Sequence, residues 1–531
     1  MPHSAFEEAA MNAKTVGNRG PRHVRALAVA AAVIVLVPAC SVVHVQLGSS
    51  ATPAATVSAS YQQLLAYARC MRAHGLPDFP TPNPSAVSRS TVRQSGKGSG
   101  PAARANAACE HLLTSASTGP STTTTASPPG AAASDCLSSQ QPCYTPKQLR
   151  VAYDVQSLLD RGITGRGQTI VLPEFPPPAT AGNQVPPTAS DIRQDLARFD
   201  RLFGLPAAQL QVVNTLAHAA SPWDASAEEV ADTEIVHAIA PGAAIREVLI
   251  PSADTASTGT VSAAAVAALR LGLTLGDVIS FSAGAGEQCF TPAQAAQWNS
   301  VLQSAEHDRV TVAASASDFG AAATACPPGT NSTRAKGVDL PASDPLALAV
   351  GGTSLRASRA TGAYTRESAW NTLSSTGGPT ASGGGFSRLF SRPAYQDGTG
   401  GTGTTRGVPD VSADADPATG MALAFTEDGR NYLIAGGGNS AATPVWAAVI
   451  ALADQYADRE LGFVNPALYL IAHSAQYHQA FHDVTTGGNT VTFATGTVIG
   501  YRAVPGWDPV TGWGSPNAQA LVPLLARYAG T

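Results

Sequence analysis

A glycine-rich segment followed by a serine is the first place in the sequence where chemistry is expected. Three glycines, 436–438, precede Asn439 and Ser440, and the apolar stretch from Val445 to Tyr456 has helical composition. A glycine turn lets the backbone approach a substrate, and the N–H groups and dipole at the start of a helix favour an anion. Ser440 is therefore a candidate nucleophile. Serine is also a common helix cap, and the motif alone leaves the two interpretations even.

A serine nucleophile needs a base, and the segment 228–242 offers two kinds. On a helix, Glu228 and Asp232 share a face with about 40° between them, whereas His237 lies about 180° from Glu228. A Ser/Glu/Asp arrangement is therefore natural here, and a Ser/His/Asp triad is awkward. The ordinary alternative is two acids on a solvated helix face.

The residues after Cys143 alternate between strand-like apolar runs and helical stretches. The strand-like runs are Thr169–Leu172, Ile245–Ile250, Asp277–Phe281 and Val310–Ala314, and the helical stretches include Asp191–Phe203 and Val261–Leu271. This alternation predicts β-α-β units, and hence an α/β fold with a parallel sheet flanked by helices.

Motifs along this part of the chain resemble, in the same order, those of the sedolisins, which are serine-carboxyl peptidases with a subtilisin-like fold. The first are Tyr144-Thr-Pro-Lys-Gln-Leu-Arg, Gly165-Arg-Gly-Gln-Thr-Ile170, Glu228-x-x-x-Asp232, Ala240-Pro241-Gly242-Ala243, Asp277-Val-Ile-Ser280 and Ala316-Ser-Asp318-Phe-Gly320. The later ones are Val350-Gly-Gly-Thr-Ser354, Gly383-Gly-Gly-Phe-Ser387, Val408-Pro-Asp-Val-Ser, the Ser440 motif, Phe481-His-Asp-Val484 and Pro505-Gly-Trp-Asp-Pro-Val-Thr-Gly512. The resemblance runs from about Tyr144 to the C-terminus, and it implies the fold and the activity of that family.

The resemblance assigns a role to each of four residues. Ser440 would be the nucleophile, Glu228 its general base and later acid, Asp232 the group that orients Glu228, and Asp318 the oxyanion-hole aspartate. A carboxylate with an ordinary pKa near 4.3 is a well-matched base only in acid, and an aspartic acid donates a hydrogen bond only when protonated. We therefore expect an acid-active endopeptidase with a polypeptide substrate.

The same resemblance implies one structural calcium ion near the C-terminus. Asp483 and Asp508 would supply carboxylates, and Val484, Val504 and Gly506 would supply main-chain carbonyls. These are all hard oxygen ligands of the type that calcium takes. Without the resemblance, two aspartates in glycine-rich loops would be read as turn caps.

The chain departs from the family pattern at three places. Ser317 stands where a glycine usually precedes the oxyanion aspartate, and Asn439 stands where a threonine usually precedes the nucleophile. Nothing between Ser41 and Asp135 resembles the family's large prodomain. These departures keep a second class open, a catalytically weak or inactive cell-surface binding or scaffold protein that retains the fold.

The N-terminal residues predict export. Basic residues at 14, 19, 22 and 25 precede an apolar stretch, Ala26–Val37, of the length of a signal-peptide core. Val37-Pro38-Ala39-Cys40 resembles a lipobox, so Cys40 is a candidate lipid anchor on the outer face of the cell membrane, and an ordinary signal peptide is the alternative. A net charge of −5 gives no basic field for nucleic acid. We expect a monomer.

Six further cysteines form local couples that an oxidising compartment could bridge. The predicted pairs are Cys70 with Cys109, Cys136 with Cys143, and Cys289 with Cys326. None of their spacings suggests zinc. The predicted organisation is a signal peptide at 1–40, a tether at 41–60, a small helical disulfide-stapled module at 61–113, a Ser/Thr/Pro-rich linker at 114–142 and the peptidase domain at 143–531. The 61–113 module, with Cys70-Met-Arg-Ala-His-Gly75, resembles a module of actinobacterial lipoproteins.

Overall fold

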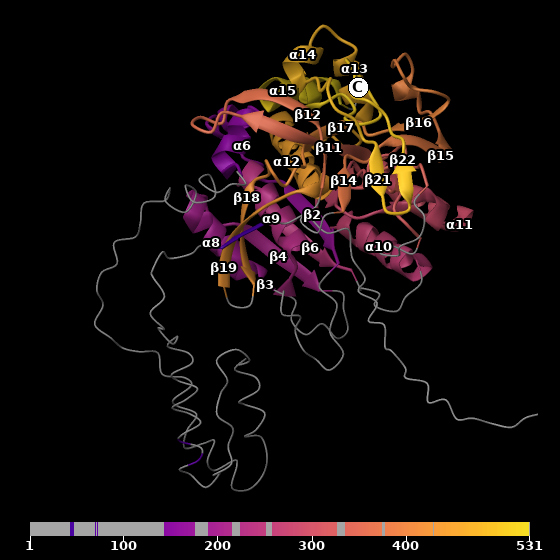
Figure 1. Ribbon diagram of the computed structural model, residues 1–531. Coiled ribbons are helices and arrows are strands. Elements are labelled where there is room, and N and C mark those ends of the chain that lie inside the picture. The colour runs from indigo at the N-terminus through magenta and orange to yellow at the C-terminus, as the bar shows by residue number, and fades with distance from the viewer. Residues whose placement is uncertain are drawn as a thin grey trace, which may run out of the picture.

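The structure of the chain is a computed structural model, shown in Figure 1. It describes residues 43–46, 70, 72, 143–175, 190–214, 224–250, 258–326, 335–373, 378–427 and 430–529. The predicted signal peptide, Cys40 and the linker 114–142 lie outside the described residues. So does the 61–113 module, apart from Cys70 and Arg72, which are helical.

A mostly parallel sheet lies at the centre of the domain. Its strands are β2 (Thr169–Glu174), β4 (Gln209–Asn214), β6 (Ala244–Leu249), β7 (Val278–Phe281), β9 (Thr311–Ser315), β11 (Leu348–Ala357), β12 (Tyr364–Ala369) and β17 (Val411–Asp414). Their order is β12-β11-β9-β7-β2-β6-β4, with β17 also paired to β11, and only β12 runs antiparallel to its neighbour. The predicted α/β fold with a parallel sheet is confirmed, and all four strand-like runs of the sequence are strands.

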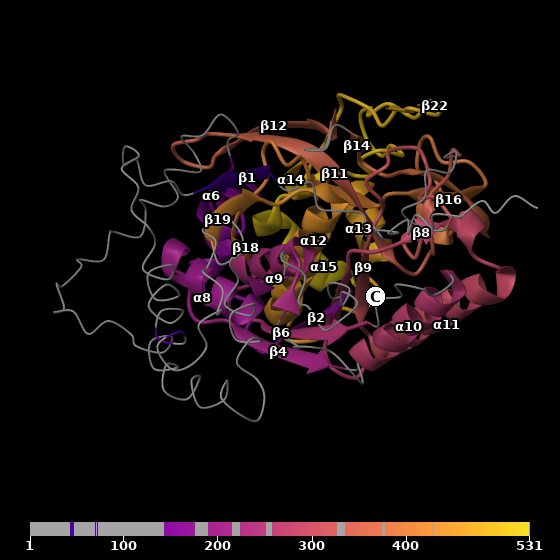
Figure 2. The same cartoon turned by 60° about the horizontal axis from the view of Figure 1, so that its bottom comes forward.

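Helices cover both faces of this sheet, and each face has its own core. Helices α9 (Ala227–Ile239), α12 (Gly438–Ala457) and α15 (Ala518–Tyr528) share one core, and α10 (Thr258–Gly272) and α11 (Pro292–Asp308) share the other. Alternate residues of β2 enter opposite cores, since Ile170 and Leu172 belong to the first and Val171 to the second. A central strand that is buried on both faces therefore reads as a continuous apolar run. Figure 2 shows α10 and α11 side by side on their face.

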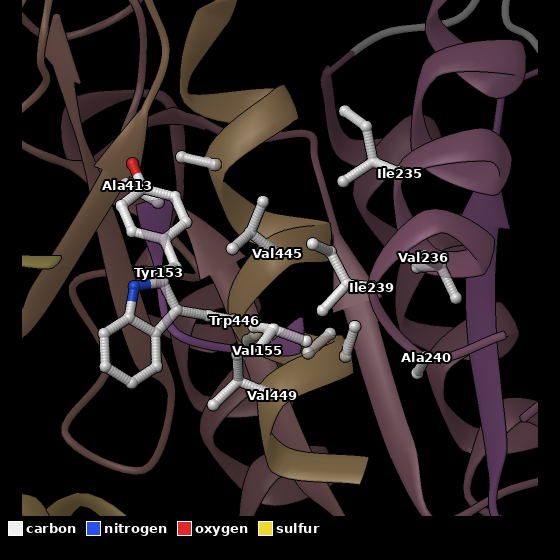
Figure 3. Packing of buried hydrophobic residues seen from close by; sticks show 14 of the residues in the cluster. Tyr153, Val155, Ile235, Val236, Ile239, Ala240, Ala413, Val445, Trp446 and Val449 are labelled. Carbon is white, nitrogen blue, oxygen red and sulfur yellow. The ribbon is translucent and has the colours of Figure 1, made fainter. Parts of the chain in front are cut away.

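Helix α12 is the central support of the first core. Every residue from Gly438 to Asp454 is buried, so the helix needs apolar side chains around its whole circumference, as the sequence from Val445 onward provides. The side chains of Ile235, Ile239 and Val445 lie between α9 and α12 in Figure 3. This packing holds the first half of α12 against the second half of α9.

Two smaller parts complete the surroundings of the site. Strands β18 (Ala422–Glu427) and β19 (Arg430–Ala435) form an antiparallel sheet with β1 (Val43–Gln46), which falls within the range predicted as a tether, and β19 leads directly to α12. Helix α8 (Ile192–Phe203) packs on β18 and α9.

The remaining elements are short. They are α6 (Pro146–Ala152), α7 (Gln156–Leu159), β3 (Ser190–Asp191), β5 (Asp224–Ala225), β8 (Ala285–Gly286), η1 (Glu287–Cys289), β10 (Asp339–Leu340), β13 (Asn371–Leu373), β14 (Pro379–Ala381), β15 (Gly385–Ser391), η2 (Ala394–Gln396), β16 (Thr405–Val408), α13 (Asn465–Ala472), α14 (Tyr477–Ala480), β20 (Phe481–His482), β21 (Val491–Phe493), β22 (Gly496–Val498) and β23 (Ser515–Pro516).

One predicted disulfide is confirmed, because Cys289 and Cys326 are bonded. Cys70 and Cys143 are each disulfide-bonded as well, and their predicted partners, Cys109 and Cys136, lie outside the described residues. Among the described helices, none is long and apolar enough to cross a membrane.

Candidate active site

Ser440 lies in the first turn of α12, where the glycines before it allow a close approach of Asp318. Gly438 has φ +83°, and a Cβ added there would lie 2.6 Å from Oδ2 of Asp318. Only glycine fits both the backbone angle and this contact. The next N–H, that of Asn439, donates to Oδ1 of Asp318 at 2.6 Å. The predicted glycine turn therefore presents the start of the helix to a carboxyl of the protein itself.

The hydroxyl of Ser440 is buried and faces Ser282, at the carboxyl end of β7. Only 2% of Ser440 is exposed, and its Oγ donates to the carbonyl of Ser282 at 3.3 Å. Pro444 has no N–H for the carbonyl of Ser440 four residues earlier, and Oγ of Ser282 lies 3.4 Å from that carbonyl instead. Ser282 thus contacts both the side-chain hydroxyl and the backbone carbonyl of Ser440.

Ser282 also joins the nucleophile to the acid pair on α9. Its Oγ donates to Oδ2 of Asp232 at 2.6 Å, and Asp232 is fully buried. Burial raises the pKa of Asp232 well above its usual range, and the nearby charge of Glu228 raises it further, although the hydrogen bond from Ser282 opposes both. Sequence analysis missed Ser282, and its position just after the predicted strand Asp277–Phe281 was the signal available.

Glu228 is half-buried in the first turn of α9, one residue before Glu229, which caps the helix. The backbone N–H of Ser226 donates to the carboxyl of Glu229, so the cap leaves Glu228 for other contacts. The charge of Glu228 acts on Asp232 and on Asp318, because it raises the pKa of both. Ser282 therefore contacts Asp232 and Ser440 and lines one pocket with Asp318, and Glu228 is near enough to Asp232 and Asp318 for its charge to act on both.

Two further buried acids, Glu174 and Glu247, lie close enough to Asp232 to interact with it electrostatically, and the sequence did not predict either. Glu174 ends β2, and its pKa is raised well above the usual range by burial and then by the charge of Asp232. Glu247 lies on β6 and accepts a hydrogen bond from Thr233 Oγ1 at 2.8 Å, and burial raises its pKa to about 7. A charged residue inside or next to an apolar strand run was the signal in each case.

Asp318 follows β9 and faces the nucleophile. It is 4% exposed, and its Oδ2 is buried without a hydrogen-bond partner among the described residues. Burial raises its pKa to about 7; the hydrogen bond from Asn439 opposes this, and the charges of Glu228 and Asp339 add to it. In acid, below this pKa, Asp318 is thus a neutral acid with an unused oxygen, which suits a hydrogen-bond donor.

A small pocket opens between Ser440 and Asp318. Apart from Gly284, its lining residues have short polar side chains: Ser282, Ser315, Ser317, Asp318, Thr324, Asp339 and Ser440. The pocket brings the candidate nucleophile and the candidate oxyanion donor to one cavity, so a carbonyl group there could contact both.

His237 does not share this site. It is fully buried, and its Nε2 donates to the carbonyl of Pro206 at 2.9 Å and lies 3.0 Å from Oδ1 of Asp200. Both contacts are on the side of α9 that packs toward α8, which agrees with the 180° separation from Glu228 read from the sequence.

The residues of the predicted calcium site contact one another, through backbone N–H groups in the case of Val504 and Gly506. The N–H of Gly506 donates to Oδ2 of Asp483 at 3.1 Å, and the N–H of Val504 donates to Oδ2 of Asp508 at 3.1 Å. Thr511 Oγ1 lies 3.5 Å from the carbonyl of Val484 and 3.1 Å from Asp508 Oδ2, which joins the two halves. Burial raises the pKa of Asp508 to about 6, and several backbone N–H groups oppose it.

These residues fit a calcium ion in one specific respect. Oδ1 of Asp483 is buried without a hydrogen-bond partner among the described residues, so it could serve as a hard oxygen ligand of a calcium ion. In the described part of the chain, no group of three or more His, Cys, Asp or Glu side chains is arranged to hold a metal. The predicted calcium set has only two such side chains, and its other ligands would be main-chain carbonyls.

Comparisons with known proteins identify relatives of this chain. Kumamolisin from Bacillus sp. (strain MN-32) is 33% identical over 405 residues, which cover 73% of this chain and 66% of kumamolisin. Sedolisin from Pseudomonas sp. (strain 101) is 37% identical over 185 residues, 35% of this chain and 30% of that protein, so the chain spans only part of the length of either relative. No family model matches the chain.

A solved structure agrees with these sequence matches. Pseudomonas sedolisin, a serine-carboxyl proteinase complexed with two molecules of pseudo-iodotyrostatin, superposes with a TM-score of 0.61 and 26% identity, covering 74% of this chain and all of that one. The subtilisin-like arrangement predicted from the sequence is confirmed by this match. The chain therefore belongs to the sedolisin family of serine-carboxyl peptidases.

Proposed function

We propose that this chain is an acid-active endopeptidase that cleaves polypeptides through Ser440, Glu228, Asp232 and Asp318. The observation that supports this most directly is the buried, unpartnered Oδ2 of Asp318, which lines one pocket with Ser440. A neutral carboxylic acid in that place can donate to an oxyanion, and it has no other hydrogen-bond partner to release first.

In the proposed reaction, Ser440 Oγ attacks the carbonyl carbon of the scissile bond, and Glu228 takes the hydroxyl proton. Protonated Asp318 donates a hydrogen bond to the oxyanion that forms. When the C–N bond breaks, Glu228 gives its proton to the leaving amine, which leaves an ester on Ser440. Water, activated by Glu228, then hydrolyses the ester and restores the serine.

This mechanism requires one rearrangement of the nucleophile. Ser440 Oγ donates to the carbonyl of Ser282 in the substrate-free chain, and it must turn toward Glu228 when a substrate binds. Catalytic hydrogen bonds often form or tighten only in the substrate complex. Asp232, held by Ser282, would keep Glu228 in place.

Hydrolysis of a denatured protein at several acid pH values tests the proposal. Wild type should produce fragments, and Ser440→Ala should not, while both variants keep the same melting temperature. Equal hydrolysis by the two would contradict the role of Ser440. An inactive wild type that is folded would favour the alternative function, a cell-surface binding or scaffold protein with this fold.

We further propose that one calcium ion binds Asp483, Asp508 and the carbonyls of Val484, Val504 and Gly506, with a structural role. A bound ion would satisfy Asp483 Oδ1, which is buried without a hydrogen-bond partner among the described residues. Excess chelator should therefore lower the melting temperature, and Asp508→Ala should lower it to a similar value and abolish the response to chelator. An unchanged melting temperature with no calcium detected in the purified protein would contradict the site.

We also propose that the protein is exported and is anchored to the membrane by a lipid on Cys40. The basic residues, the apolar stretch 26–37 and the lipobox-like sequence support it. The protein should partition with membranes into detergent, and Cys40→Ser should release it or block its processing. A mature N-terminus away from Cys40 would contradict the anchor and leave an ordinary signal peptide.

A further inference from the structure

Asn439, the residue before Ser440, is fully buried and holds the segment of Asp318 at two points. Its backbone N–H donates to Oδ1 of Asp318 at 2.6 Å, and its side-chain Nδ2 donates to the carbonyl of Ser317 at 2.9 Å. Ser317 and Asn439 are also two of the positions at which the sequence departs from the family pattern. These two departures therefore contact each other, directly beside the acid that is proposed to donate to the oxyanion.

The backbone of Ser317 needs a restraint from outside. Its φ is +91°, in the left-handed region that glycine enters readily and that residues with a side chain avoid. Ser317 comes directly before Asp318, so a return of Ser317 to negative φ would turn the peptide that joins the two residues and displace the carboxyl of Asp318. The place of Oδ2, the unused oxygen of Asp318, thus depends on the groups that keep φ positive at Ser317.

Two donors hold the carbonyl of Ser317. The N–H of Gly383 donates to it at 2.7 Å, and Nδ2 of Asn439 donates to it at 2.9 Å. One carbonyl can accept both, because it has two lone pairs. The side chain of Ser317 makes only longer contacts, 3.4 Å to Oγ1 of Thr324 and 3.4 Å to the N–H of Phe319. The amide of Asn439 is therefore one of the two strong restraints on this peptide among the described residues.

Only the nitrogen end of the Asn439 amide is used. Its Oδ1 is buried without a hydrogen-bond partner among the described residues. A Cβ added to Gly352 of β11 would overlap this oxygen, and the N–H of Gly352 already donates to Oγ of Ser382 at 2.8 Å. The amide thus fits between Gly352 and Ser317, and the carbonyl of Ser317 requires that its nitrogen face that side.

We infer that the side chain of Asn439 is a positioning group for Asp318: by holding the carbonyl of Ser317, it keeps a left-handed serine in place and keeps Oδ2 of Asp318 directed at the oxyanion. This inference rests on the proposed function. Asn439 is not among the residues that line the pocket, so it acts through Asp318 rather than on the substrate. Ser317 and Asn439 form a compensating pair, in which the amide offsets the backbone strain of the serine.

Asn439→Leu tests the inference, because leucine has nearly the shape of asparagine but donates no hydrogen bond. With a peptide that wild type cleaves in acid, kcat should fall by about tenfold to a hundredfold, since a displaced oxyanion donor is missed only in the transition state. KM should change by less than about threefold. In a Ser317→Gly background, the same substitution should lower kcat by less than about threefold, because glycine keeps a positive φ without the restraint.

Asn465→Leu is the matched control. Asn465 is also fully buried, its Oδ1 is also without a partner among the described residues, and its Nδ2 donates to the carbonyl of Ala347 at the same distance, 2.9 Å. That bond lies beside Asp410. Asn465→Leu should therefore lower the melting temperature and leave kcat close to wild type at a temperature where the variant is folded.

Three results would contradict these expectations. If Asn439→Leu does not fold, Asn439→Ala takes its place, since it removes the same donor with a smaller side chain. An active wild type whose kcat is unchanged in the folded variant at 439, or a loss of equal size with and without Ser317→Gly, would overturn the inference alone. A folded wild type that cleaves neither peptides nor a denatured protein would overturn the proposed function and this inference with it.

Discussion

Buried carboxyl groups occur in two contrasting settings in this molecule. Asp410 forms a two-pronged ion pair with Arg406, with N–O distances of 2.7 and 2.6 Å, and neither side chain is exposed. Tyr469 and the backbone N–H of Ala349 also donate to Asp410. Burial alone would lower the pKa of Arg406, yet Asp410 raises it above its ordinary value. Here a buried negative charge is matched by a buried positive one.

The carboxyls around Ser440 are in the opposite situation. The charges that act on Asp318 are those of Glu228 and Asp339, both acids, and the charges that act on Asp232 include Glu228 and Glu247. Burial and mutual repulsion therefore favour their neutral forms. The difference indicates that a matched buried carboxylate serves the fold, while a group of unmatched carboxyls can hold and move protons.

The largest expected effect is a loss of turnover that distinguishes two adjacent acids near Ser440, Glu228 and Glu229. Glu228→Gln keeps the shape but removes the proton acceptor, and by analogy with other catalytic triads turnover should fall by about 10³-fold or more. Glu229→Gln is the matched control, because a glutamine can still accept the hydrogen bond from Ser226 that caps α9. Its turnover should stay close to wild type in a steady-state assay. Equal losses in both variants would remove the distinction between them.

Substitutions in the Arg406–Asp410 ion pair should change the stability of the fold rather than the rate of peptide hydrolysis. Arg406→Met leaves Asp410 buried without its cation, which should lower the free energy of unfolding by about 3–5 kcal/mol. Adding Asp410→Asn should restore part of this loss, because no charge is then left unpaired. Asp318→Asn should cost far less, since the protein already favours a neutral group there. Denaturant unfolding measures all three, and a large loss in Asp318→Asn would contradict the comparison.

The unmatched carboxyls also set the sign of the pH dependence of stability. Burial raises the pKa of Glu247 and of Asp318 to about 7, so between pH 4 and pH 7 the folded chain holds more protons than the unfolded one. The stabilisation that these two groups add to the free energy of unfolding is fully present below their unfolded pKa and is lost as the pH rises through about 7. The free energy of unfolding falls by up to about 1.4 kcal/mol per pH unit for each group. The melting temperature should therefore fall from pH 4.5 to pH 8, and Glu247→Gln should flatten the fall. A rising melting temperature over this range would contradict these protonation states.

The sequence predicts the framework of the site better than its interior. The strand runs and the glycine turn predicted the parallel sheet and the start of α12, because burial on both faces leaves a direct pattern in the residues. The glycine turn and the helix spacing made Ser440, Glu228 and Asp232 candidates, but the family resemblance was needed to assign their roles and to find Asp318, since a pair of acids on a helix is usually solvated. The sequence did not predict Ser282, Glu174 or Glu247 as part of the site. Their place in it depends on contacts between residues far apart in the chain, such as that of Ser282 with Asp232.

The strain at Ser317 could not be predicted either. Its departure from the family's glycine is visible in the sequence, but the sign of φ and the contact with Thr324 follow only from the folded backbone. The same holds for the unused oxygen of Asp318, which depends on how Gly438 and Asn439 approach one of its two oxygens and leave the other.

The pH profile of peptide hydrolysis by wild type and by Asp318→Asn tests the central claim most directly. If a neutral Asp318 donates to the oxyanion, wild-type kcat/KM, which follows the pKa values of the free enzyme, should fall as the pH rises through about 7, the value to which burial raises the pKa of Asp318. Asparagine donates a hydrogen bond without titrating, so Asp318→Asn should keep a larger share of its own maximal activity at pH 8, even if that maximum is lower. Two profiles that decline together at the same pH would show that another group sets the limit, and they would contradict the proposed use of the unmatched carboxyls.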